Sequence, residues 1–225
     1  IYSRSKKWNL VVATSSRLMT ACLGAIISKN KKIPLYLDIR DLFIDTMKNI
    51  LSKSHLRHIL VLFKYIEKLT FNAAHTINIV SQGFENYLNI IVNNKKITFH
   101  TNGIDNIFLK NTKRNTKISY NKNIDILYAG NIGSGQALHS IIPQSAKLLE
   151  KTITFTIVGD GGKKEELERE LEKYKVKNVK IINPVDRIKL FQYYNKTDIL
   201  FIHLNDLPAF KKVLPSKLFE YASLN

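Results

Sequence analysis

One stretch decides the fold class, residues 124–148, which read IDILYAGNIGSGQALHSIIPQSAKL. An apolar segment ends at Gly130, a glycine-rich turn follows, and apolar residues then recur at helical spacing from Leu138 to Leu148. Glycines let a backbone approach a ligand, and the N–H groups at a helix start suit a phosphate. The turn therefore suggests a phosphate site. Its spacing matches neither G-x-G-x-x-G nor a P-loop, and an ordinary strand-to-helix turn uses the same residue types.

The same alternation of strand and helix runs through the chain. Short segments rich in β-branched residues and bounded by Gly, Asn, Asp or Pro predict strands at 10–13, 35–39, 76–80, 97–101, 124–129, 154–158, 179–182 and 199–204. Most are apolar throughout, which is typical of parallel strands covered on both faces. Helical patterns lie between them, among them residues 56–74. We interpret the turn VGDGG at 158–162 as local, with Asp160 as its turn-maker. These patterns predict an α/β fold with doubly wound parallel sheets.

Residues 106–123 (NIFLKNTKRNTKISYNKN) interrupt this rhythm. They are rich in Asn, Lys and Thr, and a structureless loop of that length inside one compact domain would be unusual. We therefore predict that they link two α/β domains, residues 1–105 and 124–225. The chain starts without a methionine and stops within the first turns of a predicted helix, so we expect a fragment of a longer protein.

Composition narrows the class of protein and of partner. Of the 225 residues, 44% are hydrophobic and 24% charged, which excludes a disordered chain. The single cysteine, Cys22, excludes a disulfide framework, and the six scattered histidines predict no metal site. No apolar run reaches the ~18 residues of a membrane span. Lys and Arg number 35 against 18 Asp and Glu, a net charge of +17. So basic a chain suits an anionic partner: nucleic acid, an acidic membrane surface or a phosphorylated substrate.

Charged residues follow the predicted strand 35–39 in the sequence DIRDL. Because ligands of open α/β sheets bind at the carboxyl ends of the strands, Asp38 and Asp41 are candidates for a base or for binding hydroxyls. The alternative is a structural ion pair between Arg40 and an aspartate.

A second cluster of candidates lies in the sequence PSKLFEY at 215–221. Pro215 suits the first position of a helix. Lys217 and Glu220 share a face of that helix, so they either pair with each other or bind a ligand. In the second case Lys217 contacts a phosphate, and Glu220 accepts hydrogen bonds from both hydroxyls of a ribose. Because a helix accepts alanine readily, we expect Glu220→Ala to spare folding.

Taken in order, these motifs resemble the landmarks of family-4 glycosyltransferases with the GT-B fold. The resemblance is greatest to the branch that assembles O-antigen and capsule sugars and includes fucosaminyltransferase-like enzymes. The landmarks are ATSS (13–16), DIRDL (38–42), VSQG (80–83), TNGID (101–105), AGNIG (129–133), VGDG (158–161) and PSKLFEY (215–221). They span nearly the whole chain.

The resemblance implies two Rossmann-like domains facing across a cleft, with no metal and no cofactor. The second domain would hold a nucleoside-diphosphate sugar, with UDP as the expected nucleotide, and Asn183, Pro184 and Val185 would lie near the base. The implied donor-binding residues are Gly130, Asn131, Gly133, Gln136, Lys212, Ser216, Lys217 and Glu220. Lys212 stands where the first glutamate of the family's E-x7-E motif is expected, and Glu220 matches the second. Asp38, Arg40 and Asp41 would line the acceptor side, the two aspartates as catalytic candidates.

The function implied is a retaining glycosyltransferase that moves a sugar to a lipid-linked glycan in cell-surface polysaccharide synthesis. Two alternatives stay open: a nucleotide-sugar epimerase of GT-B type, and a basic nucleic-acid-binding protein, for which no compact recognition motif occurs. Helix 56–74 carries Arg57, Lys64 and Lys68. Such basic residues are attracted to anionic lipids, so we expect a cytoplasmic protein that docks on the inner face of the plasma membrane.

Overall fold

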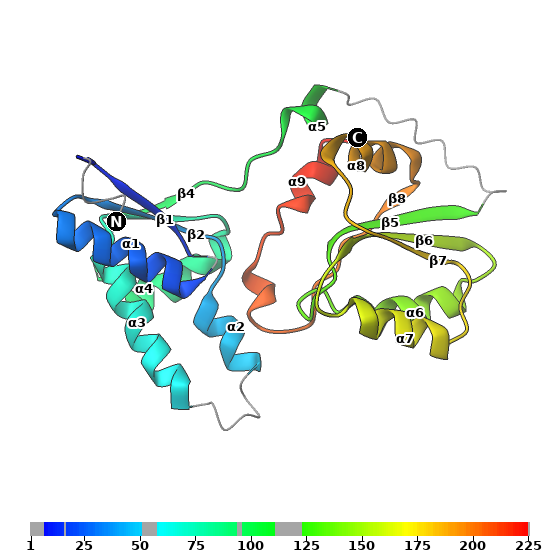
Figure 1. Cartoon of the computed structure of the whole chain (residues 1–225), viewed down its shortest axis with the longest axis horizontal. Helices are drawn as coiled ribbons and strands as arrows, with labels where there is room; N and C mark the ends of the chain where they lie inside the picture. Colours follow the sequence, from blue (N-terminus) through cyan, green and yellow to red (C-terminus); the bar gives the residue numbers. More distant parts are fainter. Residues whose placement is uncertain (1–6, 16, 51–57, 94–95, 111–122, 225) are drawn as a thin grey trace. The chain divides into compact units, whose positions relative to one another are not determined.

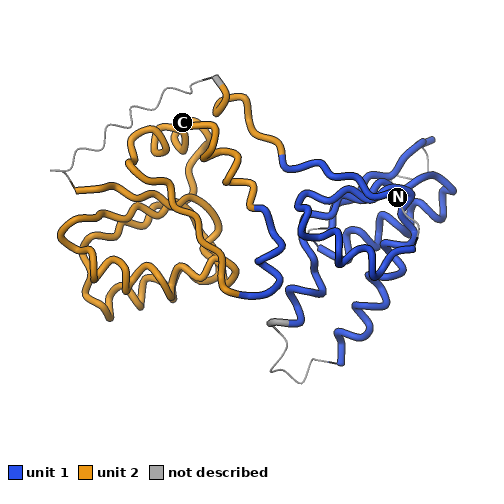
Figure 2. The backbone as a smooth tube through the Cα atoms, turned by 180° about the vertical axis from the view of Figure 1, so that it is seen from behind, with its two compact units in different colours: residues 1–102, 207–214 blue, residues 103–206, 215–225 orange. Residues whose placement is uncertain are grey.

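The computed structural model describes residues 7–15, 17–50, 58–93, 96–110 and 123–224 (Figure 1). Its contacts divide the chain into two compact units (Figure 2): residues 1–102 with 207–214, and residues 103–206 with 215–225. The segment 207–214 thus groups with the first unit, although it lies inside the predicted second domain. Ser81 Oγ donates a hydrogen bond to the Lys212 carbonyl at 2.5 Å, and a Cβ on Gly83 would lie 2.6 Å from that oxygen. The close packing at Gly83 attaches the segment to the first unit.

The first unit contains a parallel sheet with strand order β1-β2-β3-β4. Its strands are β1 (Val11–Thr14), β2 (Leu35–Ile39), β3 (Thr76–Ile79) and β4 (Lys96–Phe99). Its helices are α1 (Leu18–Lys31), α2 (Phe43–Ile50), α3 (Ile59–Ala73) and α4 (Glu85–Ile91), the last preceded by a 3-10 turn, Gln82–Phe84. Burial alternates along β2: Leu35, Leu37 and Ile39 pack in the core with side chains of α1, α3 and α4.

The second unit contains a parallel sheet with strand order β7-β6-β5-β8. Its strands are β5 (Ile124–Asn131), β6 (Ile153–Asp160), β7 (Val179–Ile182) and β8 (Ile199–Leu200). Its helices are α5 (Asn106–Lys110), α6 (Leu138–Leu148), α7 (Lys164–Lys173), α8 (Arg187–Lys196) and α9 (Lys217–Ala222), and a 3-10 turn covers Phe210–Lys212 in the segment that groups with the first unit. Successive residues of β5 pack on opposite faces of the sheet. Tyr128 belongs to a core that includes α6 and α7, and Leu127 belongs to a core that includes α5 and α8. This sheet is covered on both faces, as the continuous apolar strands predicted.

Three predicted segments differ in the structure. The predicted linker 106–123 begins with α5, because Phe108 packs in the second unit's core, 5.7 Å from the Tyr194 ring; residues 111–122 lie outside the described residues. Strand 199–204 shortens to β8. Pro215 precedes rather than starts its helix, since α9 begins at Lys217.

Two further findings bear on the membrane prediction. No described helix is both long and apolar enough to cross a bilayer. Helix α3 begins at Ile59, so Arg57 of the predicted helix 56–74 lies outside the described residues.

Candidate functional site

A pocket of about 290 Å³ lies where the strands β5 and β6 end. Gly130 and Asn131 come from β5, Gly159 and Asp160 from β6, and Lys217 from α9. Its remaining lining is apolar: Ala129, Val158, Pro184, Val185 and Leu190. The strand order reverses next to β5, which has β6 on one side and β8 on the other. Open α/β sheets bind ligands outside the carboxyl ends of strands at such a reversal, so we call this cavity the switch-point pocket.

Glycines allow the two strand ends to approach each other. A Cβ on Gly159 would lie 1.8 Å from the Gly130 carbonyl oxygen, and one on Gly161 would lie 2.5 Å from Asn131 Oδ1. Gly130 and Gly161 also adopt positive φ angles, +157° and +154°, which side chains disfavour. The Asp160 carboxylate accepts a hydrogen bond from the Gly161 N–H at 2.9 Å, as the turn-maker interpretation predicted. It also lines the pocket.

The turn after β5 is held by its own side chains and by the chain after β8. Asn131 Nδ2 donates to Gln136 Oε1 at 3.0 Å, and a Cβ on Gly133 would lie 2.5 Å from that same nitrogen. His203 Nδ1 donates to the Gln136 carbonyl at 2.7 Å, and Asn205 Nδ2 donates to the Ser134 carbonyl at 3.1 Å. Neither His203 nor Asn205 is among the site residues predicted from the sequence. Their signal was the appearance of polar residues at the end of the last predicted strand, 199–204, and directly after it.

Lys217 is the cation of the switch-point pocket. Its Cε would lie 2.7 Å from a Cβ on Gly130, so its side chain reaches the end of β5 because residue 130 is glycine. Burial lowers the pKa of Lys217, although the Glu220 carboxylate acts in the opposite direction. Within the described residues its ammonium makes no ion pair. A partly desolvated ammonium beside a strand end suits an anionic ligand.

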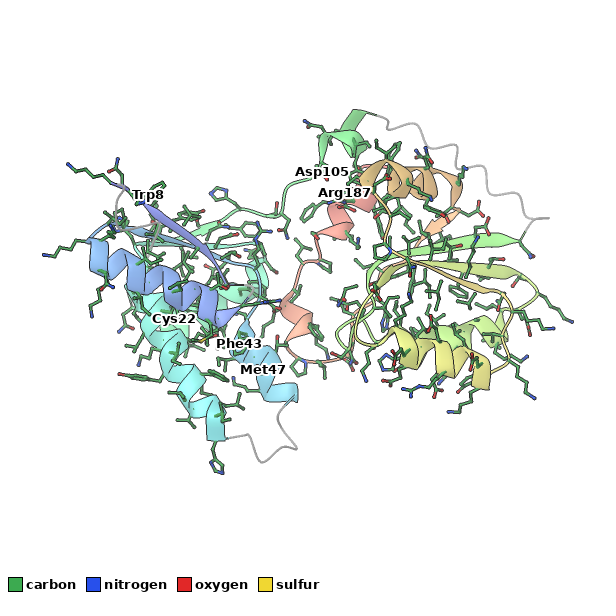
Figure 3. The ribbon with its side chains drawn as sticks, in the orientation of Figure 1. Trp8, Cys22, Phe43, Met47, Asp105 and Arg187 are labelled. Atoms are coloured by element: carbon green, nitrogen blue, oxygen red, sulfur yellow. The ribbon has the colours of Figure 1, made fainter. Side chains whose placement is uncertain are left out.

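Glu220 is 8% exposed and holds two partners from α8. Its Oε1 accepts from the Arg187 guanidinium at 2.8 Å, and its Oε2 accepts from the Tyr194 hydroxyl at 3.0 Å. Arg187 Nε also contacts Asp105 Oδ2 at 3.1 Å (Figure 3). The structural partner of Glu220 is therefore Arg187, where the sequence analysis considered Lys217. Glu220 does not itself line the pocket, but it lies one helical turn from Lys217, which does.

The remaining predicted donor residues divide between the units. Ser216 precedes α9 and makes no side-chain cap bond, so its hydroxyl is free to meet a ligand near Lys217. Lys212 lies in the first unit, where its Nζ contacts Asp45 Oδ2 at 2.6 Å. The structure thus brings Gly130, Asn131 and Lys217 into one pocket of the second unit, whereas Lys212 groups with the first unit.

Two of the predicted acceptor-side residues, Asp38 and Arg40, belong to a hydrogen-bonded cluster in the first unit. Asp38 Oδ2 pairs with Arg40 Nε at 2.8 Å, and Asp38 Oδ1 accepts from Asn78 Nδ2 at the same distance. Arg40 reaches on to Asn102 Oδ1 at 3.0 Å. The ion pair that the sequence analysis considered is therefore present. Asp41 lies apart from it, and burial raises the pKa of its carboxyl. The described residues contain no group of three or more His, Cys, Asp or Glu side chains arranged to hold a metal.

The family follows from a match to the second half of the chain. Residues 110–224 match the family described as "Glycosyl transferases group 1". The chain belongs to this family. WcaI of Escherichia coli (strain K12), named for colanic acid biosynthesis as a glycosyl transferase, is 34% identical over 98 residues, which is 44% of this chain and 24% of WcaI. The assignment favours the transferase class over the nucleic-acid-binding alternative.

Several solved structures share the fold of this group 1 glycosyltransferase chain. The structure of HepE from Anabaena in complex with UDP has a TM-score of 0.68 at 17% identity, covering 96% of this chain and 58% of HepE. The structure of WaaG, a glycosyltransferase involved in lipopolysaccharide biosynthesis, has a TM-score of 0.63 at 13% identity, covering 95% of this chain and 64% of WaaG. These likenesses confirm the predicted GT-B class of fold. The chain spans less than two thirds of each of these relatives.

Proposed function

We propose that the protein transfers a sugar from a UDP-linked donor to a lipid-linked glycan in the synthesis of a cell-surface polysaccharide. The transfer retains the anomeric configuration, and the protein belongs to family 4 and its O-antigen and capsule branch. The observation that carries this proposal is the switch-point pocket, where Gly130 and Asn131 meet the desolvated cation of Lys217. The UDP complex of HepE and the lipopolysaccharide role in the name of WaaG support the choice of donor and pathway.

The pocket suits each part of a nucleoside diphosphate. The Lys217 ammonium and the backbone around Gly130 receive the diphosphate, whose negative charge grows as the glycosidic bond breaks. The apolar side chains of Pro184 and Val185 lie against the base. Glu220 uses one acceptor site of each carboxylate oxygen for Arg187 and Tyr194. About two of its roughly four acceptor sites remain for the ribose hydroxyls. In this proposal no metal or cofactor takes part.

The first unit presents the acceptor in this proposal. The cluster of Asp38, Arg40 and Asn102 offers both donors and acceptors of hydrogen bonds to sugar hydroxyls. Asp41 is proposed as a second acceptor-side carboxylate. A lipid-linked acceptor places the protein on the cytoplasmic face of the plasma membrane.

Titration of the protein with UDP tests the donor assignment, and Lys217→Met tests its cation. We expect UDP to bind. Lys217→Met should lower the affinity for UDP by roughly 10- to 150-fold, the range for a hydrogen bond to a charged group, and should leave the affinity for uridine unchanged. The matched control is Lys180→Met, which removes an exposed lysine of β7. Absence of UDP binding at millimolar concentration contradicts the donor assignment, and an unchanged UDP affinity in Lys217→Met contradicts the role of this cation.

Lys217→Met is also expected to have a higher melting temperature than the parent protein at neutral pH. Because the pKa of Lys217 is lowered in the folded state, the unfolded chain binds more protons between that pKa and the ordinary lysine pKa. The contribution of Lys217 to stability therefore rises with pH through this window, and burial of its charge opposes folding below it. Methionine at this position removes both the pH dependence and the cost of burying the charge. Thermal unfolding from pH 7 to 10 measures the difference, and a variant less stable than the parent at pH 7 contradicts it.

Membrane association is expected to be electrostatic. Of the cations predicted on helix 56–74, the structure describes Lys64 and Lys68 on α3. We expect co-sedimentation with vesicles that contain anionic lipid, none with neutral vesicles, and release at high salt, where the screening length shortens. Equal sedimentation with both kinds of vesicle, or with neither, would contradict this docking mode and leave the transferase proposal standing.

A further inference from the structure

A second cavity, of about 360 Å³, lies within the first unit among α2, α3 and α4. Its size falls in the range of small-molecule sites. The proposed transfer step uses none of its residues, although Lys64 and Lys68 are also the cations proposed for docking on anionic lipid. Ile44, Ile90 and Ile91 supply apolar walls. Ile90 is 85% exposed, so an occupant would cover a large apolar side chain that now faces water.

The Tyr87 ring forms a further wall, and a buried carboxylate fixes its position. The Tyr87 hydroxyl donates to Glu67 Oε2 at 2.5 Å, and Glu67 is 1% exposed. Burial raises the pKa of Glu67, which opposes its ionisation. The hydrogen bond between Tyr87 and Glu67 therefore positions the ring.

Three lysines border the cavity: Lys48 on α2, and Lys64 and Lys68 on α3. Lys64 and Lys68 stand four residues apart on one helix face, where like charges destabilise a helix. In the described part of the chain neither ammonium makes a hydrogen bond or an ion pair, although the Lys68 carbonyl accepts from Asn72 Nδ2 at 2.8 Å. Lys48 Nζ makes a long contact, 3.5 Å, to Asp45 Oδ1 and lies 5.8 Å from the centre of the Tyr87 ring, while Asp45 Oδ2 holds Lys212. An anion between these lysines would relieve their repulsion.

We propose that this cavity binds the phosphate head and the first apolar carbons of a phosphorylated lipid. The lysines take the phosphate and the isoleucines take the carbon chain. Apolar side chains continue beyond the lysines on the outer surface of α3, where Val61, Tyr65 and Leu69 are all exposed. A chain leaving the cavity would lie on this surface. The choice of a lipid rests on the proposed function, whose acceptor is lipid-linked.

Calorimetric titration with octyl phosphate, below the concentration at which it forms micelles, tests the site. Octyl phosphate is expected to bind at least tenfold more tightly than inorganic phosphate, which lacks the chain, and than octyl glucoside, which lacks the charge. The double variant Lys64→Gln/Lys68→Gln should weaken octyl phosphate at least tenfold, since each lysine near a phosphate contributes about a fivefold affinity. The control Lys177→Gln/Lys180→Gln removes two exposed lysines of the second unit and should change nothing.

Ile90→Asn tests the apolar wall separately, because so exposed a side chain contributes little to folding. Ile90→Asn should lower the affinity for octyl phosphate and leave the affinity for inorganic phosphate unchanged. Octyl phosphate binding that is absent, equal to that of inorganic phosphate, or equal in the Lys64→Gln/Lys68→Gln variant would overturn the proposal. UDP titration addresses the switch-point pocket in the other unit, so failure here with UDP binding intact rejects only the lipid site.

Discussion

Gly159→Ala is expected to destabilise the protein by about 3 kcal/mol or more, the upper range for overpacking a buried site. The added Cβ would lie 1.8 Å from the Gly130 carbonyl oxygen, and the atom in its way belongs to the backbone. No side-chain rotation can relieve such a contact, so β5 and β6 must separate at their carboxyl ends. Both strand ends line the switch-point pocket, and UDP binding should therefore be lost with the stability.

Gly162→Ala is the matched control for this substitution. A Cβ at Gly162 has no atom within 4 Å, and its φ lies outside the positive range. The same chemical change three residues along the chain should leave the melting temperature within a few degrees of the parent. Urea unfolding and UDP titration of both variants measure the effects. Equal stability of Gly159→Ala and Gly162→Ala would show that the two strand ends do not approach each other this closely.

Glu220→Ala is expected to weaken UDP binding by about 1.5–3 kcal/mol, the range for hydrogen bonds to a charged group. It should also lower stability, contrary to the expectation from helix propensity alone. Tyr194 is fully buried, and its hydroxyl would lose its acceptor, which costs about 1–3 kcal/mol. Arg187 would keep Asp105 as a partner and is half exposed, so the loss of its bond to Glu220 should lower the stability by less.

Titration with inorganic diphosphate separates the two roles of Glu220. Diphosphate lacks the ribose, so its affinity should be the same in Glu220→Ala and in the parent. Tyr194→Phe is the companion variant, because it removes one partner of Glu220 and keeps both the carboxylate and the ring. A lower melting temperature with unchanged UDP affinity in Glu220→Ala would identify Glu220 as a structural partner of Arg187 and reject its role at the ribose.

Part of the site was predictable because it is local in sequence. The glycines around Gly130 mark a strand-to-helix turn, and the start of the next helix pattern at Leu138 agrees with α6. Lys217 and Glu220 stand out because three residues place them on one helix face. None of these inferences requires knowledge of which strands are neighbours.

Other parts depended on contacts between distant segments. Glu220 meets Arg187 across 33 positions, and Lys212 meets Asp45 across 167. A carboxylate has many possible basic partners in so basic a chain, and spacing along the sequence does not choose among them. The same applies to Phe108: its neighbours in a polar, Asn- and Lys-rich stretch predicted a linker, while Phe191 and Tyr194 of α8 provide the core that makes α5 a packed helix.

The sequence by itself determined the class of fold, since apolar runs and helical spacing are properties of neighbouring residues. It also determined that a glycine-rich turn lies between the strand at 124–129 and the helix pattern that starts at Leu138. The tertiary structure decided that β6 meets β5 through Gly159, that Lys217 lies in their pocket, and that Lys212 belongs to the other unit. The physical reason is that strand order and helix packing bring together residues far apart in sequence, and the burial of a charge or the clash of an added Cβ exists only once those surfaces are in contact.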